Sequence, residues 1–389
     1  MSDRDRINRR DFLVTTAGAA GTASVTAISA SAQSQPSKDP PPFHDPLIEY
    51  WRKPVSDVVD VDARLPSELQ SDAVKERHQI YSALLMKLMV RFWNGNKRGP
   101  FGEYPRRAAQ REPGSARYRG DMIEHPDGFR VNWDRYLGHN IACLAVDGNG
   151  EIIDFEFNHN DFFRSSAEHA ESRMVRRLFS LADIFDNWKT GKPIPGRSRA
   201  FSLKDVTLYT SLESCAQCSG VMSLGRVKQV VYLQTDPGAY AIGNIMFNLA
   251  GTEPGDNSSL AAIPIAGSKA GVSHFDRLNS AYAAFREDIL DADAKKDMDK
   301  EKSRSRAFFI SADGNFVDYG PSITSFLCTD VARDIFADGA RLLDGAPRFP
   351  DQQLPGRPSS LTNQQCLEEA RRFYAYADIE GYRGSPHKL

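Results

Sequence analysis

Residues 165–171 read Ser-Ser-Ala-Glu-His-Ala-Glu, and the interpretation of the whole chain starts from this stretch. It has the pattern of a helix start, because Ser165 can cap a helix and Glu168, three residues later, completes a capping box. His169 and Glu171 then fall near the positive end of the helix dipole. The stretch therefore predicts a helix that presents an imidazole and a carboxylate at its first turn.

Two cysteines downstream supply thiol groups that could bind the same metal ion as His169. Cys215 and Cys218 lie one helical turn apart in the run Glu-Ser-Cys-Ala-Gln-Cys, residues 213–218. One imidazole and two thiols leave one position of a tetrahedral zinc ion open, which is the catalytic rather than the structural pattern. A histidine at a helix start is more often a surface or capping residue, and Cys-x-x-Cys alone could be redox-active. The prediction of a zinc site that activates water therefore rests on the combination of these three groups with the unpaired carboxylate of Glu171.

Strands and helices alternate around these residues. Helices are expected at residues 67–93, 165–185 and 215–224, a hairpin with an Asp-Gly-Asn-Gly turn at 140–157, and strands at 206–210 and 227–233. The first helix is expected to be amphipathic and to pack on a sheet. The order predicts an α/β fold with a mixed sheet and helices on both faces, in three α/β/α layers.

The first 32 residues carry an export pattern. Asn-Arg-Arg-Asp-Phe-Leu at residues 8–13 is followed by a weakly apolar run and by Ala-Ser-Ala at 30–32. We expect residues 1–32 to be a twin-arginine signal peptide and the mature protein to be periplasmic or secreted. An ordinary N-terminal helix or a membrane anchor is the alternative, but the run is too short and too rich in Gly and Thr to span a bilayer stably.

The remaining chain divides by composition into three parts. Residues 33–65 are expected to be a linker, residues 66–245 the domain with the zinc site, and residues 246–389 an α+β extension without chemistry of its own. Within the domain, residues 94–135 form an insertion, either a solvated loop or a lid or anion-binding flap. The extension is expected to contain helices at 275–290, 324–343 and 361–376 and a hairpin at 307–319.

Bulk composition narrows the class of protein. The 389 residues are 41% hydrophobic, which is ample for a packed core. The net charge of −2 gives no support for a polynucleotide partner. Five cysteines, an odd number with one close pair, do not fit a disulfide framework, so metal ligation is the better interpretation of that pair.

The combined motifs resemble the cytidine deaminase-like superfamily of CMP/dCMP-type zinc deaminases, whose signature joins H-x-E to P-C-x-x-C. The resemblance covers roughly residues 70–240. A histidine as first ligand is similar to the branch that holds tRNA adenosine, guanine, deoxycytidylate and polynucleotide cytidine deaminases. The resemblance implies the deaminase-like fold and Zn²⁺ held by His169, Cys215 and Cys218. It also implies that Glu171 moves a proton from zinc-bound water to the leaving amine.

The resemblance further implies substrate contacts at Asn158, Ala170 and Ser214. The adenosine and guanine deaminase branch uses an asparagine at the place of Asn158 to hydrogen-bond the base, although Asn after a strand is as often a turn residue. Ser214 departs from the family's Leu-Glu-Pro-Cys, in which proline suits a helix start. Serine can instead cap the helix, with Gln217 at capping-box distance.

The expected function is a zinc-dependent hydrolytic deaminase that releases ammonia from a nucleobase, nucleoside or related amino-heterocycle. Expected partners are the small-molecule substrate, the twin-arginine export machinery and, as in the superfamily, further copies of the chain. A nucleic acid substrate is not expected, because tRNA is cytoplasmic. The alternatives are a non-catalytic zinc-stabilised binding or scaffold domain of the same fold, and a thiol redox protein.

Overall fold

The computed structural model describes residues 65–93, 123–124, 130–131, 139–160, 165–184, 188, 203–237, 262–294, 308–310, 316–318, 322–327 and 329–380. These residues all belong to one compact unit, Lys53–Leu389. The predicted signal peptide, nearly all of the linker and most of the predicted insertion lie outside the described residues. None of the helices in the described ranges combines the length with the apolar character that a membrane span requires.

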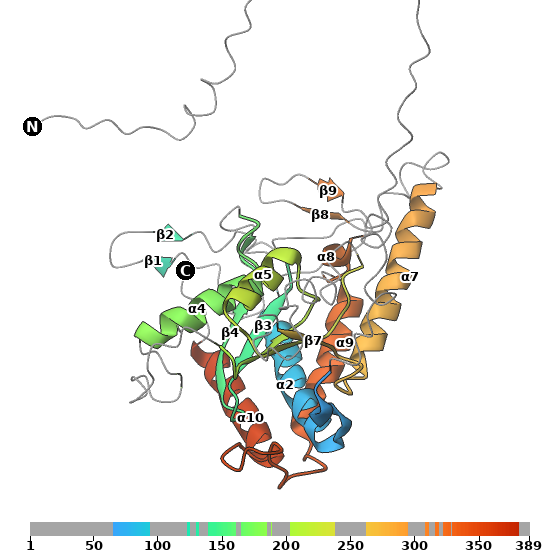
Figure 1. Ribbon diagram of the computed structural model, residues 1–389. Helices are drawn as coiled ribbons and strands as arrows, with labels where there is room; N and C mark the ends of the chain where they lie inside the picture. The colour runs from blue at the N-terminus through green and yellow to red at the C-terminus, as the bar shows by residue number, and fades with distance from the viewer. Residues whose placement is uncertain are drawn as a thin grey trace, which may run out of the picture. The chain divides into compact units, whose positions relative to one another are not determined.

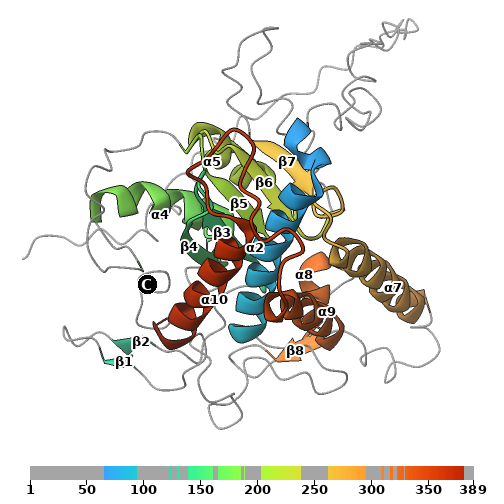
Figure 2. The same ribbon diagram turned by 90° about the horizontal axis from the view of Figure 1, so that it is seen from below.

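A five-stranded mixed sheet forms the centre of the fold (Figure 1), and its strands, all labelled in Figure 2, follow the order β4-β3-β5-β6-β7. β3 (Ala142–Val146) and β4 (Ile152–Phe157) form the predicted hairpin, and β3 also pairs antiparallel with β5 (Thr207–Thr210). β6 (Gln229–Tyr232) and β7 (Ile263–Ala266) continue the sheet in parallel. The predicted α/β fold class with a mixed sheet is confirmed.

Strand β7 was not predicted. Its sequence is Ile-Pro-Ile-Ala, and a proline within a short apolar run argues against a strand. The sheet accepts Pro264 because β7 is the last strand in the order, and an edge strand can lack one N–H donor. The sheet therefore draws its fifth strand from beyond residue 245.

The alternation of side chains along β4 separates the two helical layers. Phe155 and Phe157 pack against Phe92, which follows α2 (Asp72–Arg91), and Phe155 also meets Phe373 of α10 (Asn363–Glu380). Asp154 and Glu156 point to the other face, where α4 (Ala170–Ile184) packs beside α5 (Ala216–Leu224). Figure 2 shows α2 and α10 side by side over the sheet. The arrangement has the predicted three layers.

Helix α2, preceded by a short 3₁₀ helix η4 (Ser67–Gln70), differs from the amphipathic helix that was predicted. Its polar residues Glu76 and Arg77 are buried as well. Glu76 accepts hydrogen bonds from the N–H groups of Arg348 and Phe349, and Arg77 donates to Asn363 Oδ1 at 3.2 Å. The C-terminal segment thus covers the side of α2 that the sequence pattern would leave in solvent.

The C-terminal part supplies a further group of helices. α7 (His274–Ala294) and α9 (Asp330–Ala340) pack together, and α9 and η8 (Arg341–Asp344) lie against α2. The helix predicted at 324–343 is interrupted between α8 (Ile323–Phe326) and α9, because Thr329 Oγ1 caps α9 by accepting from the N–H of Ala332. The predicted second hairpin is present as β8 (Phe308–Ile310) and β9 (Phe316–Asp318). A small pair, β1 (Ile123–Glu124) and β2 (Arg130–Val131), lies within the predicted insertion.

Truncation of Phe155 is expected to lower the free energy of unfolding by about 3–5 kcal/mol, because the cavity left by a buried ring is not refilled. The side chain is fully buried, and its ring centroid lies 5.6 or 5.7 Å from those of Phe92, Phe157 and Phe373. Urea unfolding of Phe155→Ala measures the effect. Leu224→Ala, at a side chain that is 86% exposed, is the control and should change stability by less than about 0.5 kcal/mol. Equal midpoints for the two variants would contradict this account of the core.

Candidate metal centre

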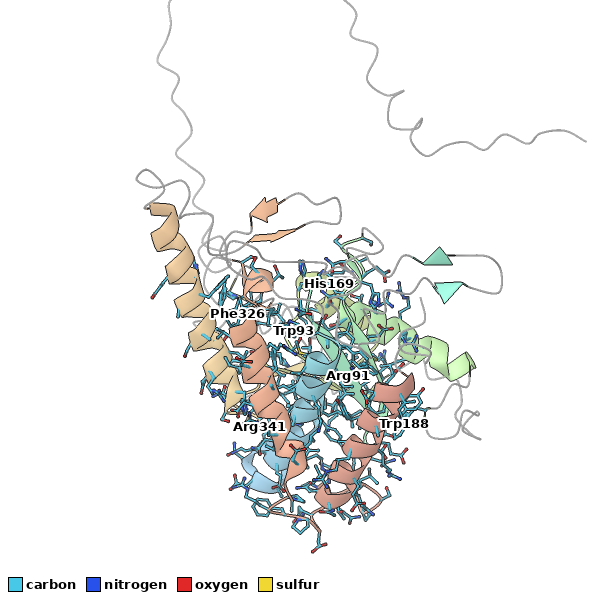
Figure 3. All side chains as sticks on the ribbon, turned by 180° about the vertical axis from the view of Figure 1, so that it is seen from behind. Arg91, Trp93, His169, Trp188, Phe326 and Arg341 are labelled. Carbon is cyan, nitrogen blue, oxygen red and sulfur yellow. The ribbon has the colours of Figure 1, made fainter. Side chains whose placement is uncertain are left out.

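His169, Cys215 and Cys218 converge at the starts of α4 and α5 (His169 is labelled in Figure 3). Cys215 Sγ lies 3.4 Å from His169 Nδ1 and 3.5 Å from Cys218 Sγ, and the third edge, Cys218 Sγ to His169 Nδ1, is 3.7 Å. Ligand atoms of a tetrahedral zinc ion with ordinary Zn–S and Zn–N bonds lie about 3.5–3.8 Å apart. These three metal-binding atoms, His169 Nδ1, Cys215 Sγ and Cys218 Sγ, are called the donor triangle below. The donor triangle fits zinc in both chemistry and size.

The helix starts hold these donors, but not through the predicted capping box. α4 begins at Ala170, and Ser165 Oγ accepts from the N–H of Ala167 in the turn before the helix. Glu168 pairs with Arg173 at 2.6 Å instead of reaching back to a cap, so this prediction was wrong. The arginine competes successfully for the carboxylate because its positive charge adds a Coulomb attraction that a backbone N–H lacks.

Asn158 provides the cap that the sequence assigned to Ser165. Its Oδ1 accepts a 2.7 Å hydrogen bond from the N–H of Ala170, the first residue of α4, and its side chain is buried. The contact satisfies one of the free N–H groups of the first turn. It also fixes the entry of the chain next to His169. The substrate contacts expected of Asn158 and Ala170 stay predictions.

Glu171 is buried beside the donor triangle, at 3% exposure. Its Oε1 accepts hydrogen bonds from Thr210 Oγ1 at 2.9 Å and from Ser214 Oγ at 3.0 Å, whereas its Oε2 lies 3.5 Å from Cys218 Sγ. Burial raises the pKa of this carboxyl above its ordinary value, although its own backbone N–H and His169 act in the opposite direction. The carboxylate is thus anchored through one oxygen and presents the other to the donors.

Ser214 does not cap α5, contrary to the prediction. Cys215 is the N-cap residue and its side chain makes no capping hydrogen bond. The hydroxyl of Ser214 instead donates to Glu171 Oε1, because a buried carboxylate is a strong acceptor of hydrogen bonds. Gln217 does not complete a capping box either; its Nε2 donates to the carbonyl of Ala167, which ties α5 to the turn before α4.

The thiols are polarised by one another. Hydrogen bonding from Cys218, supported by His169, lowers the pKa of Cys215 to about 4. The same hydrogen bond and burial raise the pKa of Cys218, and the hydrogen bond with Cys215 raises that of His169. Ser172 Oγ lies 3.3 Å from Cys218 Sγ. At neutral pH the cluster therefore contains a thiolate, the form of cysteine that binds metal.

A buried ion-pair network fixes α4 on the sheet. Arg173 donates to Glu156 Oε2 at 3.1 Å, and Arg177 lies 3.0 Å from Asp154 Oδ2. Both carboxylates and Arg173 are at most 5% exposed. This network was not predicted from the sequence, although acidic and apolar residues alternate along residues 151–157 and arginines recur at one-turn spacing on the following helix.

The pH dependence of stability should report on this network. Burial raises the pKa of Asp154 from 3.8 to about 7, with Arg177 opposing. Since the folded-state pKa exceeds the unfolded one, the native state holds the proton more tightly. The stability that this bound proton contributes is complete below about pH 4 and is lost as the pH rises to about 7.

Asp154→Asn cannot titrate, so the stability of the wild type relative to this variant should fall by a few kcal/mol between pH 4 and pH 8. Urea unfolding of both proteins across that range measures the difference. Asp205→Asn, at a surface carboxylate that pairs with Arg357, is the matched control and should follow the wild type. Parallel stability curves for the wild type and Asp154→Asn would show that the carboxyl titrates normally.

Residues 131–234 match the family model described as cytidine and deoxycytidylate deaminase zinc-binding region, and this stretch is a member of that family. The match contains the donor triangle and Glu171, so the predicted family is confirmed. A tRNA-specific adenosine deaminase of Bacillus subtilis (strain 168) is 30% identical over 105 residues, which are 27% of this chain and 54% of the relative. The chain thus spans about half the length of that relative.

Two solved structures are each similar to about a third of the chain. One comes from biochemical and structural studies of A-to-I editing by tRNA:A34 deaminases at the wobble position of transfer RNA. It is 20% identical, covers 33% of this chain and 82% of its own, and has a TM-score of 0.24. The other is guanine deaminase from Bacillus subtilis, at 22% identity, 31% and 68% coverage and a TM-score of 0.21.

Proposed function

We propose that this protein is a zinc-dependent hydrolase that converts an exocyclic amine of a small amino-heterocycle to a carbonyl and releases ammonia. The observation that carries the proposal is the placement of Glu171. Its Oε2 lies at the donor triangle, 3.5 Å from Cys218 Sγ, while its Oε1 is held by two hydroxyl groups. A zinc site that is only structural has no need for such a carboxylate.

Each residue of the site has its own role in the proposed reaction. His169, Cys215 and Cys218 would hold zinc, which supplies Lewis-acid activation of water when bound. Glu171 accepts a proton at Oε2 and returns it to the leaving nitrogen, so that the amine departs as neutral ammonia. Burial of this carboxyl raises its pKa, which suits a group that must carry the proton for part of each cycle. Burial also keeps bulk water away from the transfer.

We propose a small molecule rather than a nucleic acid as substrate, together with export to the periplasm or beyond. The support is in the sequence: the twin-arginine pattern at residues 8–13 is typical of proteins exported after folding, and a net charge of −2 offers no general attraction for a polyanion. Export of a folded chain also lets the zinc be loaded before translocation. Association of several copies of the chain is part of the same proposal.

An ammonia-release assay on the zinc-loaded protein tests the function. The panel contains the bases cytosine, adenine and guanine, their nucleosides, and pterins. We expect one class to release one ammonia per carbonyl product, and the chelated protein to be inactive until zinc is restored. Zinc-loaded protein that binds members of the panel but releases no ammonia from any of them would overturn the proposal and favour the non-catalytic binding domain.

A further inference from the structure

One oxygen of Glu171 receives both of the hydrogen bonds that hydroxyl groups donate to this carboxylate, whereas the thiol of Cys218 lies 3.5 Å from the other oxygen and donates to it. Thr210 Oγ1 and Ser214 Oγ both approach Oε1, at 2.9 and 3.0 Å, from the end of β5 and from the residue before Cys215. A carboxylate with equal surroundings can exchange its two oxygens by rotation about its last bond. Two donors on the same oxygen remove that equivalence, so Oε2 is the oxygen that faces the donor triangle.

The two hydroxyls do not serve Glu171 equally. Thr210 Oγ1 lies 2.9 Å from Glu171 Oε1 and 3.1 Å from the carbonyl oxygen of Leu212, and its one proton can serve only one acceptor at a time. Ser214 Oγ has Glu171 Oε1 as its acceptor within the described part of the chain. Ser214 is 1% exposed, so bulk water does not compete for its proton. Ser214 is therefore the donor committed to this carboxylate.

We infer that Ser214 is a positioning residue, which orients Glu171 so that Oε2 faces the three side chains that would hold zinc; this inference rests on the proposed function. The Leu-Glu-Pro-Cys motif that residues 212–215 resemble has proline here, and proline has neither a hydroxyl nor an N–H to donate. This chain therefore holds its proton-transfer residue by a contact that the motif itself lacks. A serine that is merely tolerated at the helix start would make no difference to Glu171.

Cobalt substitution tests the positioning without any substrate. The full chain is loaded with Co²⁺ in place of zinc, and its visible d–d bands report the groups around the metal. We expect Ser214→Ala to shift these bands and Ser214→Thr, which keeps a hydroxyl, to restore the wild-type spectrum. Ser219→Ala is the matched control and should leave the spectrum unchanged. Ser219 lies next to Cys218, is fully buried, and its Oγ has no hydrogen-bond partner among the described residues.

A double-mutant cycle separates positioning from general packing. If Ser214 acts through Glu171, the cobalt spectrum of Glu171→Ala with Ser214→Ala should equal that of Glu171→Ala alone. If Ser214→Ala leaves the spectrum as in the wild type, or if its shift persists fully without Glu171, the inference is wrong. Should Ser214→Ala fail to bind cobalt, Ser214→Pro takes its place in both comparisons, because proline suits a helix start.

Turnover gives the second readout. With a substrate from the ammonia screen, Ser214→Ala and Ser214→Pro should lower kcat about 10- to 100-fold with KM unchanged, since lost outer contacts of a metal site have effects of this size. If the wild type releases ammonia and the Ser214→Ala variant releases it at the same rate, the inference is wrong and the proposed function still holds. A spectral shift that depends on Glu171, in a protein that deaminates nothing, would overturn the function and leave the positioning intact.

Discussion

Replacement of Glu171 by Gln should lower ammonia release by about 10³-fold or more while the protein keeps its zinc. Glutamine has the same shape and still offers a carbonyl oxygen to Thr210 and Ser214, which donate to Oε1 at 2.9 and 3.0 Å. An amide cannot take up a proton and pass it on at neutral pH. Because one residue serves both proton transfers, the loss should lie toward the upper part of the range for general acid–base groups, about 10²–10⁴-fold.

The measurements are the rate of ammonia release and the zinc content per chain. Glu168→Gln is the matched control, because Glu168 lies three residues earlier and is engaged with Arg173 and Arg176 rather than with the donor triangle. The control should keep most of the wild-type rate. A Glu171→Gln variant that retained the wild-type rate would show that the proton travels by another route.

Replacement of Cys218 by Ser should reduce bound zinc from about one ion per chain to nearly none. Cys218 is fully buried, and its Sγ lies 3.5 Å from Cys215 Sγ and 3.7 Å from His169 Nδ1. A serine hydroxyl does not ionise to replace a thiolate, and two remaining protein ligands do not hold zinc tightly. The variant should also unfold at a lower temperature, because the metal no longer binds the native state.

Elemental analysis after gel filtration and a thermal melt with and without chelator give the two readouts. Cys366→Ser is the control, since Cys366 is equally buried but belongs to α10. It should lose some stability and keep its zinc. Stoichiometric zinc in Cys218→Ser would show that the metal is bound elsewhere.

The sequence was sufficient for the parts of the site that depend on local periodicity. A strand lies between two helices, so the residues that begin those helices meet at one edge of the sheet; this brings His169 to the Cys215–Cys218 pair. The one-turn spacing of the cysteines then places both thiols toward the histidine. The fold class followed from the same alternation of strands and helices.

The parts that were missed depend on contacts between residues far apart in the chain. Ser214 and Glu171 are separated by 43 positions, and local rules suggested capping for Ser214 because they cannot weigh a distant carboxylate. The burial of α2 depends on a hydrogen bond from Arg77 to Asn363, 286 positions away. Strand β7 exists only because β6 offers it a partner. These three features could not be predicted for the same physical reason: each depends on an interaction that only the tertiary fold creates.

The ion pairs between β4 and α4 have a consequence for metal affinity. A slip of α4 by one turn, about 5.4 Å, would separate Arg173 from Glu156 and leave a buried charge without its partner. At a cost of about 3–5 kcal/mol, fewer than about one molecule in a hundred would occupy the slipped position. The apparent dissociation constant of a ligand is the intrinsic one divided by the fraction of molecules that are competent to bind. With α4 held in one position that fraction stays close to one, so His169 meets the cysteines before the ion arrives and the apparent zinc affinity should equal the intrinsic affinity.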